Sequence, residues 1–475
     1  MFIKEVQARN FRLFPATSPP FSVELKVPDA QTEGSGLTVF VGQNGCGKTA
    51  LLDAIALPIL SFKAEGLALE DFNDPSKDVE IRVRSQIPFT VDGTMPNSKF
   101  QAQGFLLKAN VRSKVNRAYL SSTIVSDQLF IKAGDKPKDT SPDLRVSVNN
   151  PFKGRRFDEN DVLFLDQNRT YQTRLGTYNP TRFNRLMEDF DFQHIGRHKQ
   201  AVPNIQQHLD ATRDNTSNAF LKLAVERFKE ISGNDLSLSL IDNWKPFGNA
   251  FLAINKANNQ QIPLRMLGSG YEMIFAILLA FHLSQQSSKQ LICLIDEPEL
   301  HLHPSLQEQF VTVLLDFSRT AQIVLSTHSP LLVKQLSVNG NVGVQILGKE
   351  HDVPSLIPMA QGVVPYASVN EANYLAFGLA TAEYHDELYG HIQETQLKYA
   401  ESDMIAYLNS RGQRNTRKWN SEKSGLPSGD RDVPLQVFIR NKIHHPENKA
   451  MRSSSYSPAE LEQSTREMID IIKRP

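Results

Sequence analysis

The sequence predicts an α/β protein with a mixed sheet and a parallel core, joined by a helical lobe and a C-terminal α-helical module. Three observations support this fold class. Apolar runs such as LTVFV, LICLI and IVLS are typical of strands buried on both faces of a parallel sheet. Residues 79–170 mostly alternate apolar and polar side chains, which indicates further strands. Beyond Pro365 the apolar spacing becomes helical.

Length and composition fit a globular protein of more than one domain in a reducing compartment. Of 475 residues, 40% are hydrophobic and 22% are charged. Lys plus Arg and Asp plus Glu number 52 each, so contact with DNA is possible only through a local patch. Cys46 and Cys293 are too few for a disulfide framework. The run Met273–Leu283 is about half the length that spans a bilayer, so we expect a cytoplasmic protein without membrane contact.

The first buried strand leads into a glycine-rich phosphate loop. GQNGCGKT follows LTVFV and precedes helical spacing, so G-x-x-x-x-G-K-[ST] has the strand and helix on either side that it requires. Backbone N–H groups and the helix N-terminus can surround phosphate oxygens, while the lysine reaches the β- and γ-phosphates. The threonine hydroxyl can bind Mg²⁺. The predicted nucleotide-binding residues are Asn44, Gly45, Cys46, Gly47, Lys48 and Thr49.

Polar residues follow two later strands of the predicted parallel core. LICLI delivers Asp296 and Glu297 to a strand end, where Asp296 can hold the metal with Thr49 and Glu297 can polarise a water in line with the γ-phosphate. His328 stands at the end of the next strand and can hydrogen-bond the γ-phosphate. We therefore predict Glu297 and His328 as catalytic residues.

A glycine turn, Leu267-Gly268-Ser269-Gly270-Tyr271, opens a long apolar helix before Asp296. By itself such a turn resembles an ordinary helix cap. These four pieces, in this order, resemble the ABC-type ATPase head, in the bacterial branch shared with SMC-like, RecF-like and OLD-type proteins. ARNFRLF, VGQNGCGKTALLDAI, DEPELHLHP and STHSP carry the likeness over about residues 1–350.

The resemblance implies ATP with Mg²⁺ and a homo-oligomer. In the family, ATP lies between two heads, and Ser269 and Gly270 would contact the partner's nucleotide. The family's signature usually begins Leu-Ser, whereas Gly268 is second here, so both a slow ATPase and an ATP-binding switch are allowed. We assign 1–178 and 233–350 to the head, 179–232 to an inserted helical lobe, and 351–475 to the C-terminal helical module, with a mobile loop at 409–432.

The tail resembles the C-terminal part of PtuA, the ATPase family of the Septu anti-phage system, and the PARIS defence ATPase is the second likeness. The segments that carry it are ASVNEANYLAFGLATAEYHDELYGHI, FIRNKIHHPEN and YSPAELEQSTREMIDII. This likeness implies a separate HNH-type nuclease as partner. After His328 no D-x-D follows a strand, so we do not expect a metal nuclease within this chain.

Three hypotheses stay open for the basic segment RNKIHH, whose candidate contact residues are Arg440, Asn441, His444 and His445. The segment can end a helix and dock a partner, with the arginine paired to a carboxylate of a neighbouring helix. It can contact nucleic acid. It also fits R-x-x-x-x-H, the pattern of HEPN ribonucleases, which makes an ATP-gated ribonuclease the alternative function. Ser457 and Glu460 predict a capping box for the following helix.

Overall fold

The computed structural model consists of two compact units, residues Met1–Leu356 (unit 1) and Ile357–Pro475 (unit 2). It describes residues 2–59, 67, 69–92, 99–114, 117–127, 130–131, 162–165, 172–174, 177–179, 219–238, 251–254, 261–286, 290–357, 363–365, 368–423 and 426–473. The domain limits inferred from the sequence stay predictions. Most of the inferred lobe, 179–232, lies outside the described residues, apart from helix α4, Ala219–Ser232.

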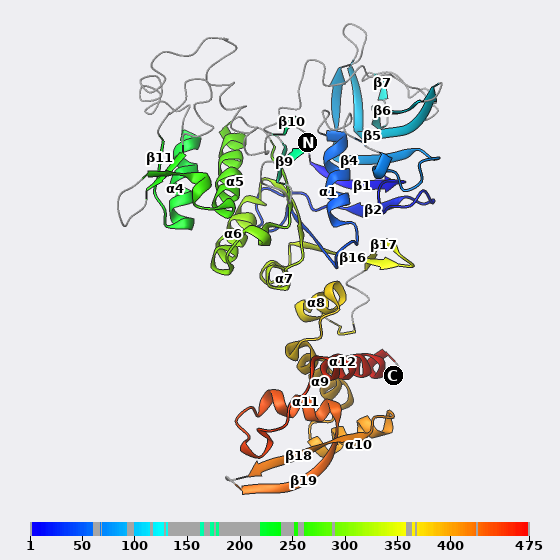
Figure 1. Ribbon diagram of the computed structural model, residues 1–475, viewed down its shortest axis with the longest axis vertical. Coiled ribbons are helices and arrows are strands. Elements are labelled where there is room, and N and C mark those ends of the chain that lie inside the picture. The colour runs from blue at the N-terminus through cyan, green and yellow to red at the C-terminus, as the bar shows by residue number, and fades with distance from the viewer. Residues whose placement is uncertain are drawn as a thin grey trace. The chain divides into compact units, whose positions relative to one another are not determined.

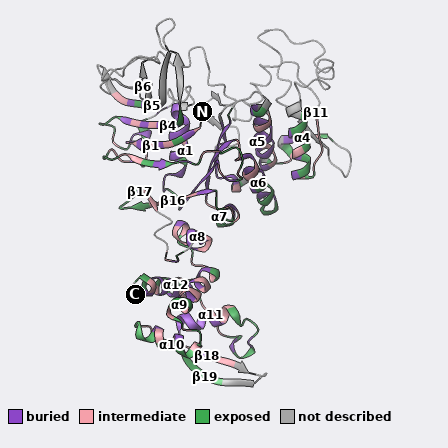
Figure 2. Cartoon of the chain, turned by 180° about the vertical axis from the view of Figure 1, so that it is seen from behind, coloured by how far each residue is buried: buried purple, intermediate pink, exposed green. Residues whose placement is uncertain are grey.

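A six-stranded sheet forms the centre of unit 1, in the order β17-β16-β3-β15-β14-β8 (Figure 1). The pairs β16–β3, β3–β15, β15–β14 and β14–β8 are parallel. Strands β3, β14 and β15 are buried at every position, as their uninterrupted apolar sequences predict (Figure 2). The bounds are β3 Leu37–Val41, β8 Val162–Leu165, β14 Ile292–Asp296, β15 Gln322–Thr327, β16 Gly343–Glu350 and β17 Val353–Ile357.

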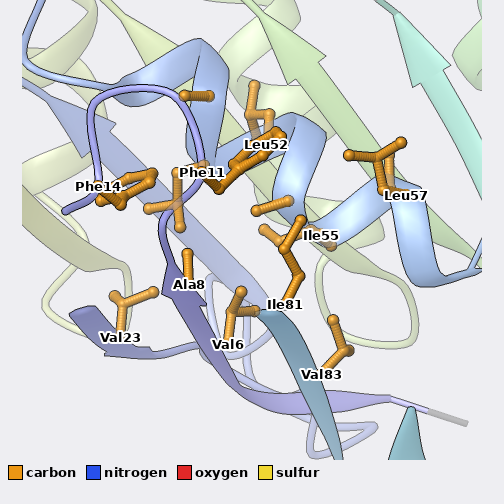
Figure 3. Packing of buried hydrophobic residues seen from close by; sticks show 14 of the residues in the cluster. Val6, Ala8, Phe11, Phe14, Val23, Leu52, Ile55, Leu57, Ile81 and Val83 are labelled. Atoms are coloured by element: carbon orange, nitrogen blue, oxygen red, sulfur yellow. The ribbon is translucent and has the colours of Figure 1, made fainter. Parts of the chain in front are cut away.

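A second sheet of unit 1 is antiparallel, in the order β2-β1-β4-β5-β6, with β7 paired to β5. Helix α1 contacts β14 and β15 on one side and β1, β4 and β5 on the other. Because both sides of α1 are covered by a sheet, its apolar residues do not form a single stripe. Figure 3 shows Leu52 and Ile55 of α1 over Val6, Ile81 and Val83. The bounds are α1 Lys48–Ile59, β1 Ile3–Arg9, β2 Phe21–Glu24, β4 Val79–Asp92, β5 Lys99–Lys114, β6 Arg117–Asp127 and β7 Phe130–Ile131.

Arg12 connects the N-terminal segment to α1. Its Nη1 lies 2.7 Å from Asp53 Oδ2, and its Nε lies 2.8 Å from Asp71 Oδ1. Asp53 belongs to α1, and Asp71 ends the short 3-10 helix Leu69–Asp71. Arg12 therefore joins the N-terminal segment to both the phosphate-loop helix and this 3-10 helix.

Helices α4, α5, α6 and α7 complete unit 1, together with shorter elements. Phe228 of α4 packs edge-on against Phe275 of α5, with ring centroids 5.6 Å apart. Phe281 of α5 stacks on Phe317 of α6. The helices are α5 Ser269–Gln286, α6 Pro304–Phe317 and α7 Pro330–Ser337. The shorter elements are β9 Gln172–Arg174, β10 Thr177–Asn179, β11 Leu236–Leu238, β12 Phe251–Ile254, β13 Gln261–Pro263, η5 Leu264–Met266 and η6 Pro298–His301.

Unit 2 has its own core, built around Tyr384, Leu388, Trp419, Phe438 and Met468. Its capping box is confirmed: the Ser457 N–H donates to Glu460 Oε2 at 2.8 Å, and the Glu460 N–H donates to Ser457 Oγ at 3.3 Å. The elements are α8 Val369–Phe377, α9 Ala382–Gln396, α10 Glu401–Ser410, β18 Asn415–Lys423, β19 Leu426–Pro434, α11 Leu435–His444, η8 Lys449–Met451 and α12 Pro458–Lys473.

The prediction of a mobile loop at 409–432 is wrong for most of that stretch, because β18 and β19 form an antiparallel hairpin there. Each strand buries an apolar side chain, Trp419 in β18 and Val433 in β19. The Trp419 ring meets Phe438 of α11 edge-on, and the Arg417 guanidinium lies over the same ring. One apolar side chain in a polar strand produces no alternation, so the hairpin depends on tertiary packing that the local sequence does not reveal.

Candidate nucleotide site

The phosphate loop lies between β3 and α1, and its glycines have conformations that other residues rarely adopt. Gly45 has φ 73° and Gly47 has φ 99°. A Cβ on Gly42 would lie 2.2 Å from the Leu347 carbonyl oxygen of β16. The loop therefore needs glycine for its turn and for its close approach to the neighbouring strand.

Lys48 is the first residue of α1 and is almost fully buried, with 4% of its surface exposed. Its ammonium donates to the carbonyls of Gly42 at 2.9 Å and Gln43 at 3.1 Å, and lies 3.8 Å from Cys46 Sγ. Burial lowers the pKa of Lys48, while nearby Glu297 and Asp296 oppose that shift. The positive charge is thus held inside the curve of the loop.

Thr49 and Asp296 meet although they are far apart in the sequence. The Thr49 hydroxyl donates to Asp296 Oδ2 at 3.0 Å, and Ser326 Oγ of β15 donates to Asp296 Oδ1. Asp296 is fully buried, and this burial raises the pKa of its carboxyl group. The two predicted metal ligands, Thr49 near the start of α1 and Asp296 at the end of β14, therefore lie side by side.

Glu297 and His328 also form a contact. Glu297 Oε1 lies 2.8 Å from His328 Nε2, and His328 Nδ1 lies 3.3 Å from Lys48 Nζ. An ammonium can only donate, so Nδ1 accepts and the ring proton belongs to Nε2, which donates to the carboxylate. Glu297 itself has left-handed backbone angles, φ 46° and ψ 61°, at a cost of about 1–3 kcal/mol for a non-glycine residue. That conformation turns the chain at the end of β14.

Three polar residues around this site were not predicted from the sequence. Ser326 holds Asp296, and Glu299 Oε1 accepts from the Thr327 hydroxyl at 2.8 Å and from the His328 N–H at 2.5 Å. The Lys349 ammonium lies 3.5 Å from where a Cβ on Gly45 would stand. The only sequence signal for Ser326 and Glu299 is their place next to strand ends.

The structure places Ser269 and Gly270 at the first turn of α5. Gly268 and Gly270 line a cavity of about 340 Å³ formed by α4, α5 and α6. Gly268 has φ 124° with open space around it, so its backbone conformation favours glycine over the usual serine. The cavity's lining residues are Ile231, Ser232, Leu267, Gly268, Gly270, Tyr271, His303, Ser305, Leu306 and Gln309, and none belongs to the phosphate loop.

The remaining candidate residues, Arg440, Asn441, His444 and His445, belong to unit 2 and end helix α11. Arg440 is half-buried and Asn441 is buried, whereas both histidines are exposed. Within the described residues, no carboxylate lies within ion-pairing distance of Arg440, so the expected pairing with a neighbouring helix is wrong.

The residues of unit 1 fit a magnesium nucleotide chemically. Because the glycines of the loop carry no Cβ, phosphate oxygens can approach its backbone N–H groups, and Lys48 adds a positive charge. Thr49 and Asp296 offer adjacent oxygen atoms, the ligand type that Mg²⁺ prefers. In the part of the chain that the structure describes, no group of three or more His, Cys, Asp or Glu residues suited to a metal is found.

A glycine loop and strand-end carboxylates on a parallel sheet agree with the predicted fold class, and the α/β fold of an ABC-type ATPase head is confirmed. The chain belongs to the family described as "AAA domain, putative AbiEii toxin, Type IV TA system", whose model matches residues 37–334. Among solved structures, the SMC head bound to the C-terminal winged-helix domain of ScpA is similar, with a TM-score of 0.45 and 14% identity over 75% of this chain and 97% of that one.

Two curated relatives confirm the resemblance to OLD-type proteins and to PtuA. The OLD nuclease of Thermus scotoductus is 24% identical over 74% of this chain, and the chain spans 62% of that relative. The Septu protein PtuA of Bacillus thuringiensis is 22% identical over 66% of this chain and 70% of the relative. Among the described residues, no helix is long and apolar enough to cross a membrane.

Proposed function

We propose that this chain binds and hydrolyses ATP as the regulatory subunit of an anti-phage defence complex. The observation that carries the proposal is the convergence of Lys48, Thr49, Asp296, Glu297 and His328 at one edge of the parallel sheet. The likeness to PtuA and to the OLD nuclease supports a role in defence.

In the proposed site, Lys48 contacts the β- and γ-phosphates, and Thr49 with Asp296 holds Mg²⁺. The metal, when bound, neutralises developing negative charge on the phosphates. Glu297 would polarise the attacking water, because it is the strand-end carboxylate that is not committed to Thr49. The Nε2–H of His328 would donate to the γ-phosphate once ATP competes with Glu297 for it.

ATP would also join two heads. Ser269 and Gly270 open α5 with free backbone N–H groups at a helix N-terminus, which favours an anionic group of a second molecule. We propose that two copies close over ATP in this way, and that the closed oligomer controls a separate nuclease of the HNH type. The PtuA likeness supports such a partner. The complex of the closed oligomer and the nuclease would then contact DNA.

The test is Glu297→Gln, which replaces the polarising carboxylate with a neutral amide of nearly the same size. We expect ATP hydrolysis to fall by about 10²–10⁴-fold, the range that general base catalysis supplies. Bound ATP should persist, and light scattering should detect a larger oligomer in Mg-ATP than for the wild type. Glu308→Gln, on the exposed side of α6, is the matched control. Unchanged hydrolysis and unchanged oligomer size in Glu297→Gln would refute the proposed site.

A further inference from the structure

Glu299 connects the two strand ends that carry the proposed base and the histidine, although the proposed function gives it no role. It lies in η6, two residues after Glu297, which follows the end of β14. Its Oε1 atom accepts two hydrogen bonds from the end of β15, one from the Thr327 hydroxyl at 2.8 Å and one from the backbone N–H of His328 at 2.5 Å. A single carboxylate oxygen thus joins the turn after β14 to the end of β15.

The contacts of Thr327 and Ser329 show that the main chain is held on both sides of the histidine. Thr327 is fully buried, and its hydroxyl oxygen accepts from the backbone N–H of Ser329 at 2.9 Å while donating to Glu299. Ser329 is the N-cap of α7, and its own hydroxyl accepts from the backbone N–H of Leu332 at 3.2 Å. Glu299 therefore holds the end of β15, and the capped first turn of α7 holds the residues that follow.

The imidazole of His328 depends on this support. Its side chain is 27% exposed, so packing alone does not fix the ring. Nε2 donates to Glu297 at 2.8 Å, whereas the 3.3 Å between Nδ1 and Lys48 Nζ is already longer than the usual range of about 2.7–3.2 Å. Catalytic groups have to be held within about 0.5 Å of their productive place, and a shift of this size at the backbone would break the contact with Lys48.

The other carboxylate oxygen of Glu299 indicates a role beyond stability. Oε2 is buried and has no hydrogen-bond partner among the described residues. A buried acceptor without a partner destabilises a fold, so its presence calls for a compensating role. An ionised carboxylate is the strong acceptor that can hold two donors at one oxygen atom. The cost of burying Oε2 is therefore explained by what Oε1 does at the end of β15.

We propose that Glu299 is the positioning residue of His328. It holds the main chain at His328 so that the imidazole stays where it meets the γ-phosphate, and it does not touch the reacting atoms itself. The inference rests on the proposed function, since it concerns the same ATP site. Glu299 acts on turnover and not on ATP affinity, because the glycine loop and Lys48 belong to other elements.

The first experiment compares ATP hydrolysis and Mg-ATP binding in the full chain. Glu299→Ala should lower kcat by about 10²-fold, the effect of a misplacement of about 1 Å. The Kd and the stoichiometry of binding, measured by isothermal titration, should stay within about threefold of the wild type. Glu299→Gln keeps an acceptor oxygen and should lose less activity than Glu299→Ala. Glu308→Ala, on the exposed side of α6, is the matched control.

A second readout does not depend on hydrolysis. In protein labelled with ¹⁵N-histidine, at alkaline pH where imidazoles are neutral, His328 should carry its proton on Nε2 and none on Nδ1. Its signals are assigned by their loss in His328→Gln. Glu299→Ala should move them towards the averaged positions of an imidazole that exchanges between tautomers, and Glu308→Ala should leave them unchanged.

The two proposals fail in different ways. A wild type that neither binds nor hydrolyses ATP refutes the proposed function and this inference with it. If the wild type hydrolyses ATP, the inference alone is overturned by a wild-type kcat in Glu299→Ala, by equal losses of kcat and binding stoichiometry, or by unchanged His328 signals.

Circular dichroism checks the folding of each variant. If Glu299→Ala unfolds, Thr327→Val takes its place, because it removes one of the two donors and keeps the size of the side chain. It should lower kcat by about tenfold with an unchanged Kd. In that case, wild-type kcat in both Thr327→Val and Glu299→Gln overturns the inference.

Discussion

The polar clusters of the two units are built on different elements. In unit 1, Lys48, Asp296 and Glu297 are 4%, 0% and 8% exposed, and they lie where buried parallel strands end. In unit 2, the side chains of His444 and Asp386 are 41% and 40% exposed, and they face each other across two helices. At strand ends, the hydrogen bonding between strands positions the polar side chains. Between two helices, the polar side chains are positioned by contacts with each other, and these contacts are accessible to water.

The difference in burial has electrostatic consequences. Burial lowers the pKa of Lys48 and raises that of Asp296, so the functional candidates of unit 1 are themselves perturbed. In unit 2 the buried histidine is His385, outside the polar cluster. Its ring is completely buried, its Nε2 lies 2.8 Å from Ser464 Oγ, and burial lowers its pKa to about 4.

The largest predicted effect concerns His385 and the stability of unit 2 against acid. Its folded pKa of about 4 lies below the ordinary value of 6.5, so the unfolded state binds a proton first as the pH falls. Stability is full above about pH 6.5 and declines down to about pH 4, by about 3 kcal/mol in total. In a Trp244→Phe background, urea unfolding followed by Trp419 fluorescence should detect the decline.

His385→Gln should flatten this pH dependence, because the replacement does not titrate. His391→Gln, on the same helix, should leave it as it is in the parent. An equal slope in His385→Gln and the parent between pH 7 and 5 would show that His385 is not the buried titrating group.

A smaller effect concerns the edge of the nucleotide site. Lys349→Gln should weaken ATP binding about tenfold, equal to about 1.4 kcal/mol, because the Lys349 ammonium lies beside Gly45 and can contact phosphate. Lys334→Gln, on the exposed side of α7, is the matched control. Isothermal titration with ATP and Mg²⁺ measures both. Equal affinities for Lys349→Gln and the wild type would place β16 outside the nucleotide site.

The smallest effect concerns the start of α12. Ser457→Ala removes one half of the capping box with Glu460 and should cost about 1 kcal/mol of the stability of unit 2. The same Trp419 unfolding assay measures the loss. Ser455→Ala, just before the helix, should change stability by less than about 0.5 kcal/mol. If both serine variants lose the same stability, the cap is not formed in solution.

The sequence predicted those parts of the site that local order determines. The phosphate loop needs only a strand, a glycine turn and a helix. Thr49 follows the end of β3 and lies beside Asp296 at the end of β14, because parallel strands end at the same edge of a sheet. Ser326, Glu299 and Lys349 were missed because their roles depend on which strand lies beside which. The roles assigned to Lys48, Glu297 and His328 stay proposals.

In unit 2, prediction failed where packing between distant segments decides the structure. Trp419 and Val433 give no alternation along their strands, yet their burial makes a hairpin of a polar stretch. The pairing of His444 with Asp386 requires the register between α9 and α11, which no spacing within RNKIHH contains. The pattern pointed to His445, whereas the oriented ring is that of His444.

In the proposed ATP site of unit 1, the positive charge that binds the phosphates comes from Lys48. The most direct measurement is equilibrium binding of ATP with Mg²⁺ to wild-type protein and to Lys48→Ala, with the Trp419 unfolding assay confirming that unit 2 is unchanged. The wild type should bind, and Lys48→Ala should lose detectable binding, because no other cation inside the loop replaces the ammonium held by Gly42 and Gln43. Undiminished affinity in Lys48→Ala would contradict the account.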